Sequence, residues 1–424
     1  MAPKISTESY KGVRDFYPED YFIQNYIFEV WRKTVESFGY SRYDASILES
    51  SELYKAKSGE EIVNEQTYTF LDRGEREVTL RPEMTPTVAR MVAAKERELS
   101  FPLRWYSIPN LFRYEKPQRG RLREHWQLNV DLFGVESSYA DIEIINIAYQ
   151  IMKNFGAKEE DFIIKINDRR LIGKLYEKFE LSEDASYKLS KIIDKKDKIS
   201  AEAFQESVAS ILGDKSLDFI SLLNSHEKLL DFLGENEISK QLVETIEELL
   251  KLGVKNIYFD PTLMRGFDYY TGIVFEVFDT DPKNNRSVFG GGRYDELMDI
   301  FGARKVPSVG FGAGDVTARD FLESHNLLPD VKGVANIYIC TANNDYKNEA
   351  LILAQKLRSQ NVSTSVDITD KKLGDQIKNA NRNKVPFVIV LGEDEIKSEV
   401  YTLKNLETGE EKKIKLEEVI QNII

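Results

Sequence analysis

The chain has 424 residues, of which 42% are hydrophobic and 30% charged, a balance that excludes both a disordered chain and a membrane-spanning one. With 71 acidic and 58 basic residues its formal net charge is −13, so bulk charge does not predict a nucleic-acid partner. A single cysteine, Cys340, excludes an intramolecular disulfide, and three scattered histidines argue against a zinc site. The N-terminal segment lacks the apolar stretch of a signal peptide, so we expect a cytoplasmic protein without a membrane anchor.

The first part of the chain predicts two helices and an antiparallel sheet. Apolar residues recur at helical spacing over Glu19–Phe38, and Gly39 follows as a stop signal. A second amphipathic helix is predicted over Ala140–Asn154. Alternating runs between them predict strands in QTYTFLD, REVTLRPE, PLRWYSIPNLFRYE and HWQLNVDLFG.

The rest of the chain changes character twice. From about Asp168 to Gly253 it is rich in Lys, Glu and Leu with almost no Gly or Pro, which predicts an all-helical insertion. Strand-like, glycine-rich sequence then runs from Asn256 to Gly314. After a linker at about Leu327–Gly333, strands and helices alternate to the end, which predicts a compact α/β domain with a parallel sheet.

One short segment concentrates positive charge. Arg113–Arg123 reads RYEKPQRGRLR and forms the turn of the predicted long hairpin. Guanidinium groups suit phosphate oxygens, so Arg113, Arg121 and Arg123 could bind a nucleotide polyphosphate, and the turn itself could meet a nucleic-acid backbone. A solvated Lys/Arg-rich hairpin tip explains this segment equally well.

Two further clusters are ambiguous when taken singly. In LMRGFDYYTGIVFEVF, Arg265 precedes two tyrosines between glycines, which suits either a pocket for a small polar substrate or a β-turn with core aromatics. Glu83, Gln127 and Asp131 interrupt apolar strands, so they either face solvent or need a partner such as a bound ammonium. The glycine-rich GGGRY and VGFGAGD segments fit neither a P-loop nor a well-framed dinucleotide fingerprint.

The order of these segments resembles that of histidyl-tRNA synthetase, a class II aminoacyl-tRNA synthetase. The matching segments are KGVRDFYPED, LRPEMTPTVARMVA, FRYEKPQRGRLREHWQLNVDLFG, LMRGFDYYTGIVFEV, GGGRYDEL and KLGDQIKNANRNKVPFVIVLGEDE. The resemblance covers nearly the whole chain and implies an α+β fold. Residues 1–332 would form the class II catalytic domain, a six-stranded antiparallel sheet with flanking helices and the helical insertion at about 168–253. Residues 333–424 would form an α/β anticodon-binding domain.

The resemblance also implies a function, histidine–tRNA ligase, for a cytoplasmic homodimer. ATP, accompanied by Mg²⁺, and L-histidine would give histidyl-adenylate and pyrophosphate, and the histidyl group would then pass to the terminal ribose of tRNA-His. By matching positions, Arg113 and Arg265 would be catalytic, and Gln118 would lie near the tRNA acceptor end. The histidine site would comprise Glu83, Met84, Thr85, Arg113, Gln127, Asp131, Arg265, Tyr269, Tyr270 and Tyr294. The ATP site would comprise Arg113, Glu115, Arg121, Arg123 and His125, with no resident metal ion bound by the protein.

Some positions depart from the pattern of this family. Thr317 stands where motif 3 usually has an arginine that clamps the γ-phosphate; Arg319 or Arg121 could supply that charge instead. Asp131 replaces a more common glutamate, His125 replaces a stacking phenylalanine, and motif 1 lacks its usual proline before ILE. The alternative function is therefore a catalytically silent regulatory relative that binds histidine or tRNA, such as the regulatory subunit of ATP phosphoribosyltransferase. The DYYTG signature argues against a synthetase of proline or threonine type.

Overall fold

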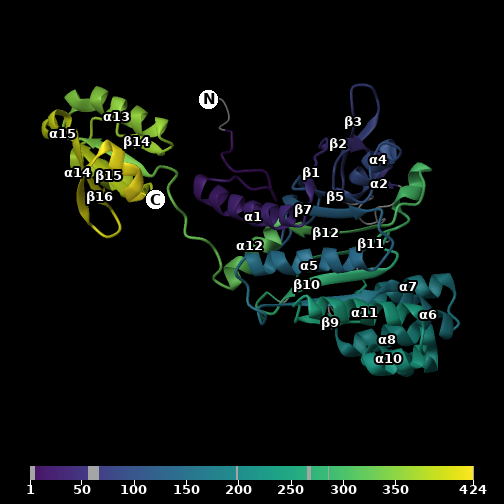
Figure 1. Ribbon diagram of the computed structural model, residues 1–424. Coiled ribbons are helices and arrows are strands. Elements are labelled where there is room, and N and C mark those ends of the chain that lie inside the picture. The colour runs from purple at the N-terminus through teal and green to yellow at the C-terminus, as the bar shows by residue number, and fades with distance from the viewer. Residues whose placement is uncertain (1–4, 56–65, 197–198, 265–268, 285, 424) are drawn as a thin grey trace. The chain divides into compact units, whose positions relative to one another are not determined.

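The computed structural model describes residues 5–55, 66–196, 199–264, 269–284 and 286–423. The chain divides into two compact units, Met1–Leu328 and Pro329–Ile424, which are described separately below (Figure 1). Among the helices of the described residues, none has the length and apolar character needed to cross a membrane.

The first unit is built on a large sheet whose six central strands run antiparallel, in the order β5-β7-β12-β11-β10-β8. Strands β1 and β9 join its two edges in parallel, and β6 pairs with the start of β7. The strands are β1 Ser41–Arg42, β5 Leu103–Ser107, β6 Asn110–Phe112, β7 Glu124–Phe133, β8 Phe162–Asp168, β9 Ile257–Phe259, β10 Ile273–Asp279, β11 Ser287–Arg293 and β12 Ser308–Gly314. The six antiparallel strands confirm the predicted fold class.

A second, three-stranded sheet has the order β2-β4-β3. Its strands are β2 Leu48–Ser50, β3 Tyr68–Leu71 and β4 Glu77–Leu80, and the short helix α2, Ser51–Lys55, follows β2 directly. The chain then enters α4, Thr85–Lys95, whose first turn carries Pro86 at a position where the missing N–H costs nothing. The segment that connects β4 to α4 places Glu83 and Thr85 next to residues of the large sheet.

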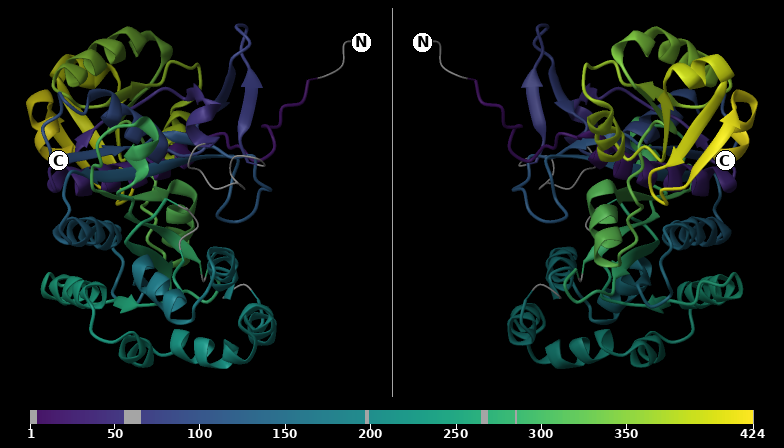
Figure 2. Two further views of the ribbon diagram at one scale, coloured as in Figure 1. Left: turned by 90° about the vertical axis from the view of Figure 1, so that its right-hand side faces the viewer. Right: turned by 90° about the vertical axis from the view of Figure 1, so that its left-hand side faces the viewer.

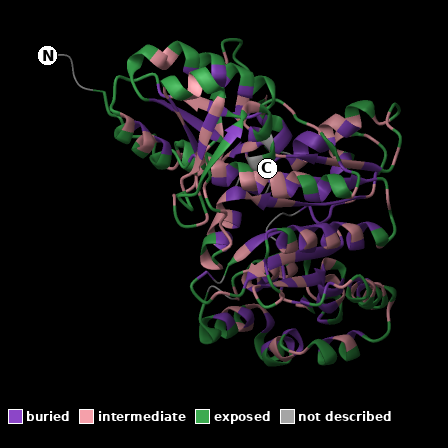
Figure 3. Ribbon diagram, turned by 60° about the vertical axis from the view of Figure 1, so that its left-hand side comes forward, coloured by how far each residue is buried: buried purple, intermediate pink, exposed green. Residues whose placement is uncertain are grey.

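Three helices pack on the large sheet: α1 Pro18–Ser37, α5 Tyr139–Asn154 and α12 Asp315–Ser324. Helix α1 ends before Gly39, whose φ of +82° suits glycine, and α1 and α5 confirm the two predicted helices to within a residue. Helix α5 contacts β7, β10, β11 and β12, and most of its isoleucines are buried (Figure 1). Figure 3 colours the central strands mainly as buried, which locates the core between the sheet and these helices.

The helical insertion lies between β8 and β9, as the composition predicts. Its helices are α6 Arg169–Lys178, α7 Glu183–Ile193, α8 Ala201–Leu212, α9 Ser216–Leu223, α10 His226–Leu233 and α11 Glu237–Lys251. Ser182, Ser200, Ser225 and Asn236 each accept a hydrogen bond from a backbone N–H of the first turn that follows, which fixes where these helices begin. Figure 2 shows the teal helices gathered at one end of the unit.

The second unit is an α/β domain with a five-stranded sheet of order β14-β13-β15-β16-β17. The predicted parallel pairing is confirmed for β14, β13 and β15, while β16 and β17 extend the sheet as an antiparallel hairpin. The elements are β13 Ile337–Thr341, α13 Lys347–Ser359, β14 Thr364–Val366, α14 Leu373–Arg382, β15 Phe387–Leu391, α15 Glu393–Ser398, β16 Val400–Asn405, β17 Glu411–Lys415 and α16 Val419–Ile423.

Candidate active site

A cavity of about 110 Å³ lies over the central strands of the large sheet. Segments from six parts of the first unit meet there, although they are far apart in sequence. The lining residues are Glu83, Thr85, Arg113, Gln127, Asn129, Tyr269, Tyr270, Gly290, Tyr294, Gly310, Phe311 and Gly312. The structure therefore brings seven predicted site residues to one cavity: Glu83, Thr85, Arg113, Gln127, Tyr269, Tyr270 and Tyr294.

Glycines of β12 leave the space that the cavity occupies. A Cβ atom on Gly312 would lie 2.3 Å from Nε2 of Gln127, and one on Gly310 would lie 2.4 Å from the carbonyl oxygen of Val130. The segment VGFGAGD is thus a central strand with glycine at alternate positions, and not a phosphate-binding loop. Period-two glycines within a strand are a signal of close approach that sequence reasoning did not use.

A row of polar side chains on β7 faces the same side of the sheet. Gln127, Asn129 and Asp131 are two residues apart, which places them on one face of a strand. Nε2 of Gln127 donates to Oδ1 of Asn129 (2.7 Å), and Nδ2 of Asn129 donates to the backbone carbonyl of Gln127 (3.1 Å). Sequence reasoning found the two outer members and missed Asn129, which the same alternation identifies.

Asp131 lies behind the lining of the cavity. Its carboxylate accepts hydrogen bonds from the hydroxyls of Tyr294 and, at 3.5 Å, Tyr43. Burial raises the pKa of Asp131 to about 7, although both tyrosine hydroxyls act to lower it. Burial and the neighbouring carboxyl raise the pKa of Tyr294 well above its usual range, so Tyr294 remains a hydrogen-bond donor.

Tyr269, Tyr270 and Tyr294 form an aromatic wall with ring centroids 4.9 to 6.5 Å apart. The hydroxyl of Tyr269 donates to Oε2 of Glu83 (3.3 Å). Glu83 is buried, with 2% of its surface exposed. A buried carboxylate next to tyrosine hydroxyls suits a ligand with a cationic amine and a small polar ring.

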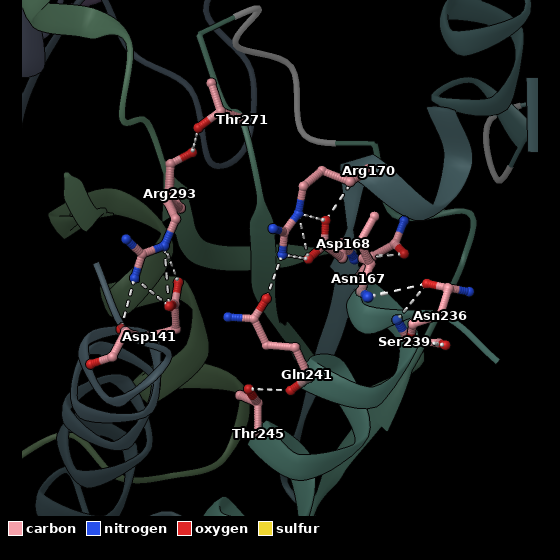
Figure 4. A network of polar contacts seen from close by, with 12 residues as sticks. Asp141, Asn167, Asp168, Arg170, Asn236, Ser239, Gln241, Thr245, Thr271 and Arg293 are labelled. Carbon is pink, nitrogen blue, oxygen red and sulfur yellow. Dashed lines mark hydrogen bonds and ion pairs between the residues drawn. The ribbon is translucent and has the colours of Figure 1, made fainter. Parts of the chain in front are cut away.

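Arg293, at the end of β11, anchors the segment that carries Tyr294. Its Nε lies 3.2 Å from each carboxylate oxygen of Asp141 on α5, and its Nη1 donates to the carbonyl of Val135 (3.1 Å). The N–H of Thr271 donates to the carbonyl of Arg293 (2.8 Å), which joins this residue to the chain entering β10. Figure 4 shows Arg293 between Asp141 and Thr271, so it is a positioning residue that sequence reasoning missed.

The hairpin of β6 and β7 carries the basic segment, but only its first arginine reaches the cavity. Nε of Arg113 donates to the carbonyl of Pro82 (2.9 Å), directly before Glu83. Nη1 of Arg121 pairs with Oε2 of Glu115 (3.3 Å) at the side of the hairpin. Arg113 therefore lines the cavity, whereas Arg121 is paired with Glu115 and does not line it.

Arg123 fastens the hairpin to the N-terminal segment. Its guanidinium lies 4.1 Å from the centroid of the Tyr114 ring and donates to the hydroxyl of Tyr10 (3.0 Å). Its backbone N–H donates to the carbonyl of Gly12 (2.7 Å). A stacked guanidinium with these partners holds the N-terminal segment against the hairpin.

Met84, Gln118 and His125 are not among the residues that line the cavity. Met84 is buried at the start of α4, and Gln118 lies in the hairpin turn, where its backbone pairs with Arg121. Burial, with the nearby Arg113 and Arg14, lowers the pKa of His125 to about 3, so its ring is neutral near pH 7. Arg265 lies outside the described residues.

Arg319 and Arg121, the two cations suggested as replacements for the motif 3 arginine, are not among the residues that line the cavity. Arg319 pairs with Asp20 (3.1 Å) and Glu323 (2.9 Å), and Arg121 pairs with Glu115. Thr317 itself donates its hydroxyl to the carbonyls of Val288 (2.6 Å) and Gly314 (3.1 Å). Among the described residues, no group of three or more His, Cys, Asp and Glu side chains is arranged to hold a metal ion.

Comparison with known proteins agrees with this geometry. A family model described as histidyl-tRNA synthetase matches residues 12–316, and one described as an anticodon binding domain matches residues 336–424. A protein named histidine–tRNA ligase from Leptospira biflexa is 44% identical over 99% of this chain and 98% of its own length. Another protein of that name, from Thermoplasma volcanium, is 36% identical over 98% of each chain.

The fold agrees as well. The crystal structure of histidyl-tRNA synthetase from Nostoc sp. PCC 7120 superposes with a TM-score of 0.86, at 23% identity over 99% of both chains. The motif order, the antiparallel sheet with its cavity and the full-length relatives lead to one assignment. The chain belongs to the histidyl-tRNA synthetase family.

Proposed function

We propose that this protein is an active histidine–tRNA ligase. In the first step a carboxylate oxygen of histidine attacks the α-phosphorus of ATP, and the bond to the pyrophosphate leaving group breaks. In the second step a hydroxyl of the terminal ribose of tRNA-His attacks the histidyl carbonyl carbon, and AMP leaves. The observation that carries this proposal is the cavity, in which a buried carboxylate, an amide, an arginine and three tyrosines converge.

Each part of the amino acid has a matching group. The ammonium is assigned to Glu83, Thr85 and Gln127, because a carboxylate, a hydroxyl and an amide that can accept hydrogen bonds from it line the cavity together. The imidazole is assigned to the pocket of Tyr269, Tyr270 and Tyr294, with Asp131 acting on the ligand through the Tyr294 hydroxyl. Met84, buried at the start of α4, is assigned to holding its sequence neighbours Glu83 and Thr85 in place.

ATP is assigned to the positive side of the cavity. Arg113 bridges the histidine carboxylate and the α-phosphate, and Arg265 stabilises the charge that develops on the phosphorus. Arg121 and Arg123 are assigned to the remaining phosphates, a contact for which Arg121 would exchange its ion pair with Glu115. Mg²⁺ would arrive with the triphosphate and neutralise part of its charge.

Two further assignments concern the nucleotide base and the tRNA. Glu115 and His125 lie on the adenine side, where a neutral imidazole can stack on the base. Gln118, in the hairpin turn, is assigned to the acceptor end of tRNA-His. The anticodon-binding domain would contact the other end of the same tRNA.

We also propose that two copies of the chain associate. One face of the three-stranded sheet exposes large apolar side chains: Leu48 is 48% exposed and Phe70 47%, and their strand partners Leu80 and Val78 lie two residues apart on β4. Neighbouring exposed apolar residues on a sheet mark a contact surface. Sedimentation of Phe70→Asp should give a lighter species than the unmodified chain if this sheet is the dimer contact.

The test of the ligase function is histidine-dependent ATP–pyrophosphate exchange with Mg²⁺, comparing histidine with each other amino acid. We expect exchange with histidine alone. Glu83→Gln should reduce histidine binding roughly 10-fold to 100-fold, because it removes a charge-assisted hydrogen bond. A protein that binds histidine in calorimetry but exchanges no pyrophosphate would be a regulatory relative instead.

A further inference from the structure

The tip of the β6–β7 hairpin rests on a segment that is distant in sequence. The backbones of Gln118 and Arg121 pair, which leaves Arg119 and Gly120 at the turn. Nη1 of Arg286, from the loop between β10 and β11, donates to the carbonyl of Arg119 (2.5 Å). Nη1 of Arg119 donates in turn to the carbonyl of Lys283 (3.4 Å). The fold thus adds an arginine to the basic hairpin from outside the segment that the sequence identified.

Arg286 lies beside the position where a cation is missing. A Cβ atom on Gly120 would lie 3.6 Å from Nη1 of Arg286, 3.6 Å from Cγ2 of Thr317 and 3.7 Å from Oδ2 of Asp320. The guanidinium of Arg286 and the side chain of Thr317 are therefore neighbours across one glycine. Thr317 is uncharged and its hydroxyl is bonded to two backbone carbonyls, so it supplies no positive charge. Arg286 supplies that charge beside it, whereas Arg119 lies 3.8 Å from the Asp320 carboxylate.

The charges around Arg286 leave it suited to an anion. Arg286 donates to the backbone carbonyl of Arg119, which carries no formal charge, and the Arg286 side chain is exposed. Asp320 is the nearby carboxyl, 3.8 Å from Nε of Arg119; burial raises its pKa, while Arg119 and Arg286 act against that rise. A guanidinium held by a neutral carbonyl can exchange that bond for a phosphate oxygen at little cost.

The separation of Arg286 from the cavity can be spanned by a triphosphate together with an arginine side chain. Arg286 precedes β11, and Gly290, four residues later on that strand, lines the cavity. At about 3.3 Å per residue, Arg286 lies roughly 13 Å along the strand from the cavity. With the α-phosphate at Arg113, the β- and γ-phosphates cover only part of this separation, and the long side chain of Arg286 covers the rest.

We propose that Arg286 binds the triphosphate of ATP and supplies the positive charge that Thr317 lacks. This proposal rests on the proposed ligase function, because it concerns the same nucleotide. Arg286 is then a catalytic residue that comes from the β10–β11 loop, where the sequence shows no basic cluster.

The test compares Arg286→Ala with the unmodified chain in pyrophosphate exchange. We expect the KM for ATP to rise about tenfold or more and the KM for histidine to stay unchanged. The matched control is Lys283→Ala, in the same loop, which should leave both constants unchanged. Arg286→Lys should recover part of the ATP affinity, since it keeps the charge and loses the fork.

A second variant distinguishes charge replacement from a general disturbance of the loop. Adding Thr317→Arg to Arg286→Ala should lower the KM for ATP again, whereas Thr317→Arg alone should change it little. Unchanged ATP constants in Arg286→Ala, in a chain that exchanges pyrophosphate normally, would overturn the role of Arg286 and leave the ligase function intact.

If the unmodified chain exchanges no pyrophosphate, calorimetry with Mg²⁺-ATP decides the matter without the chemical step. Weaker ATP binding by Arg286→Ala than by the unmodified chain would support the phosphate contact although the ligase function had failed. Equal binding, or no binding by either protein, would overturn it.

Discussion

The two sheets of this protein use their faces differently. In the second unit, Ile337 and Ile339 of β13 pack with residues of α13, while Tyr338 and Cys340 of the same strand pack around Ala380 of α14. Both faces are therefore filled with apolar side chains. In the first unit, α5 and α12 pack on the large sheet, and Gly310 and Gly312 leave room elsewhere on it for the cavity.

This difference shows what a binding site requires of a sheet. A filled face gains stability from apolar burial but leaves no space for a ligand. The face that carries the cavity instead has glycines and buried polar groups, such as Asn129 and Asp131, which need partners.

Truncating the filled sheet should have the largest effect on stability. Ile389 of β15 is fully buried in the cluster around α13, so Ile389→Ala should lower the free energy of unfolding of the second unit by about 2–5 kcal/mol. Pyrophosphate exchange should persist, because the proposed adenylation residues are all in the first unit. Thermal unfolding measures the loss of stability, and assays of pyrophosphate exchange and tRNA charging show which activity is affected. Loss of both activities would contradict the separation of roles between the two units.

Filling the open face should affect binding more than stability. Gly312→Ala places a methyl group where the Gln127 amide lies, so the amide must move away from the cavity. We expect histidine binding to weaken by about 1.5–3 kcal/mol, the usual cost of a lost hydrogen bond to a charged group. Isothermal titration with histidine measures this, and unchanged affinity would show that Gln127 does not contact the ligand.

The buried carboxyl of the open face should make stability depend on pH. The folded pKa of Asp131, about 7, lies above its ordinary value of 3.8, so the folded chain keeps a proton that the unfolded chain releases. The resulting stability is fully present below about pH 4 and is lost as the pH rises toward 7. Between pH 5 and 7 we expect about 2 kcal/mol of this loss, measured by urea unfolding.

Asp131→Asn is the control for this pH dependence, because it keeps the shape and removes the titrating group. Its unfolding free energy should vary less with pH over the same interval. Parallel profiles for the two proteins would mean that other buried carboxyls, such as Asp141, cause the trend.

The smallest effect is expected from a glycine that faces neither a cavity nor a core. A Cβ atom on Gly374, in the first turn of α14, would meet nothing within 4 Å. Gly374→Ala should therefore stabilise the second unit slightly, by at most about 1 kcal/mol, through helix propensity. Urea unfolding measures this change in stability. Isothermal titration with histidine, run beside Gly312→Ala, tests whether the effect of a glycine depends on its position; a loss of histidine binding in Gly374→Ala would contradict that view.

The sequence by itself determined the elements of this protein and their order. Apolar periodicity locates α1 and α5, composition marks the helical insertion, and the ordered motifs give the family. These features could be predicted because each depends on residues close together in the chain: helical spacing and capping act over a few residues. For the same reason Gln127 on β7, and the segments outside strands that carry Glu83 and Tyr269, were predictable as candidates.

Only the tertiary structure decided which side chains meet. Arg293 meets Asp141, Tyr43 meets Asp131, and Arg286 meets the tip of the basic hairpin, each across more than eighty residues of sequence. Such contacts depend on strand order and register in the large sheet, since a shift of one residue would turn every side chain to the opposite face. The physical reason is that local patterns fix which face of an element is apolar, while the packing of distant elements fixes what its polar side chains touch.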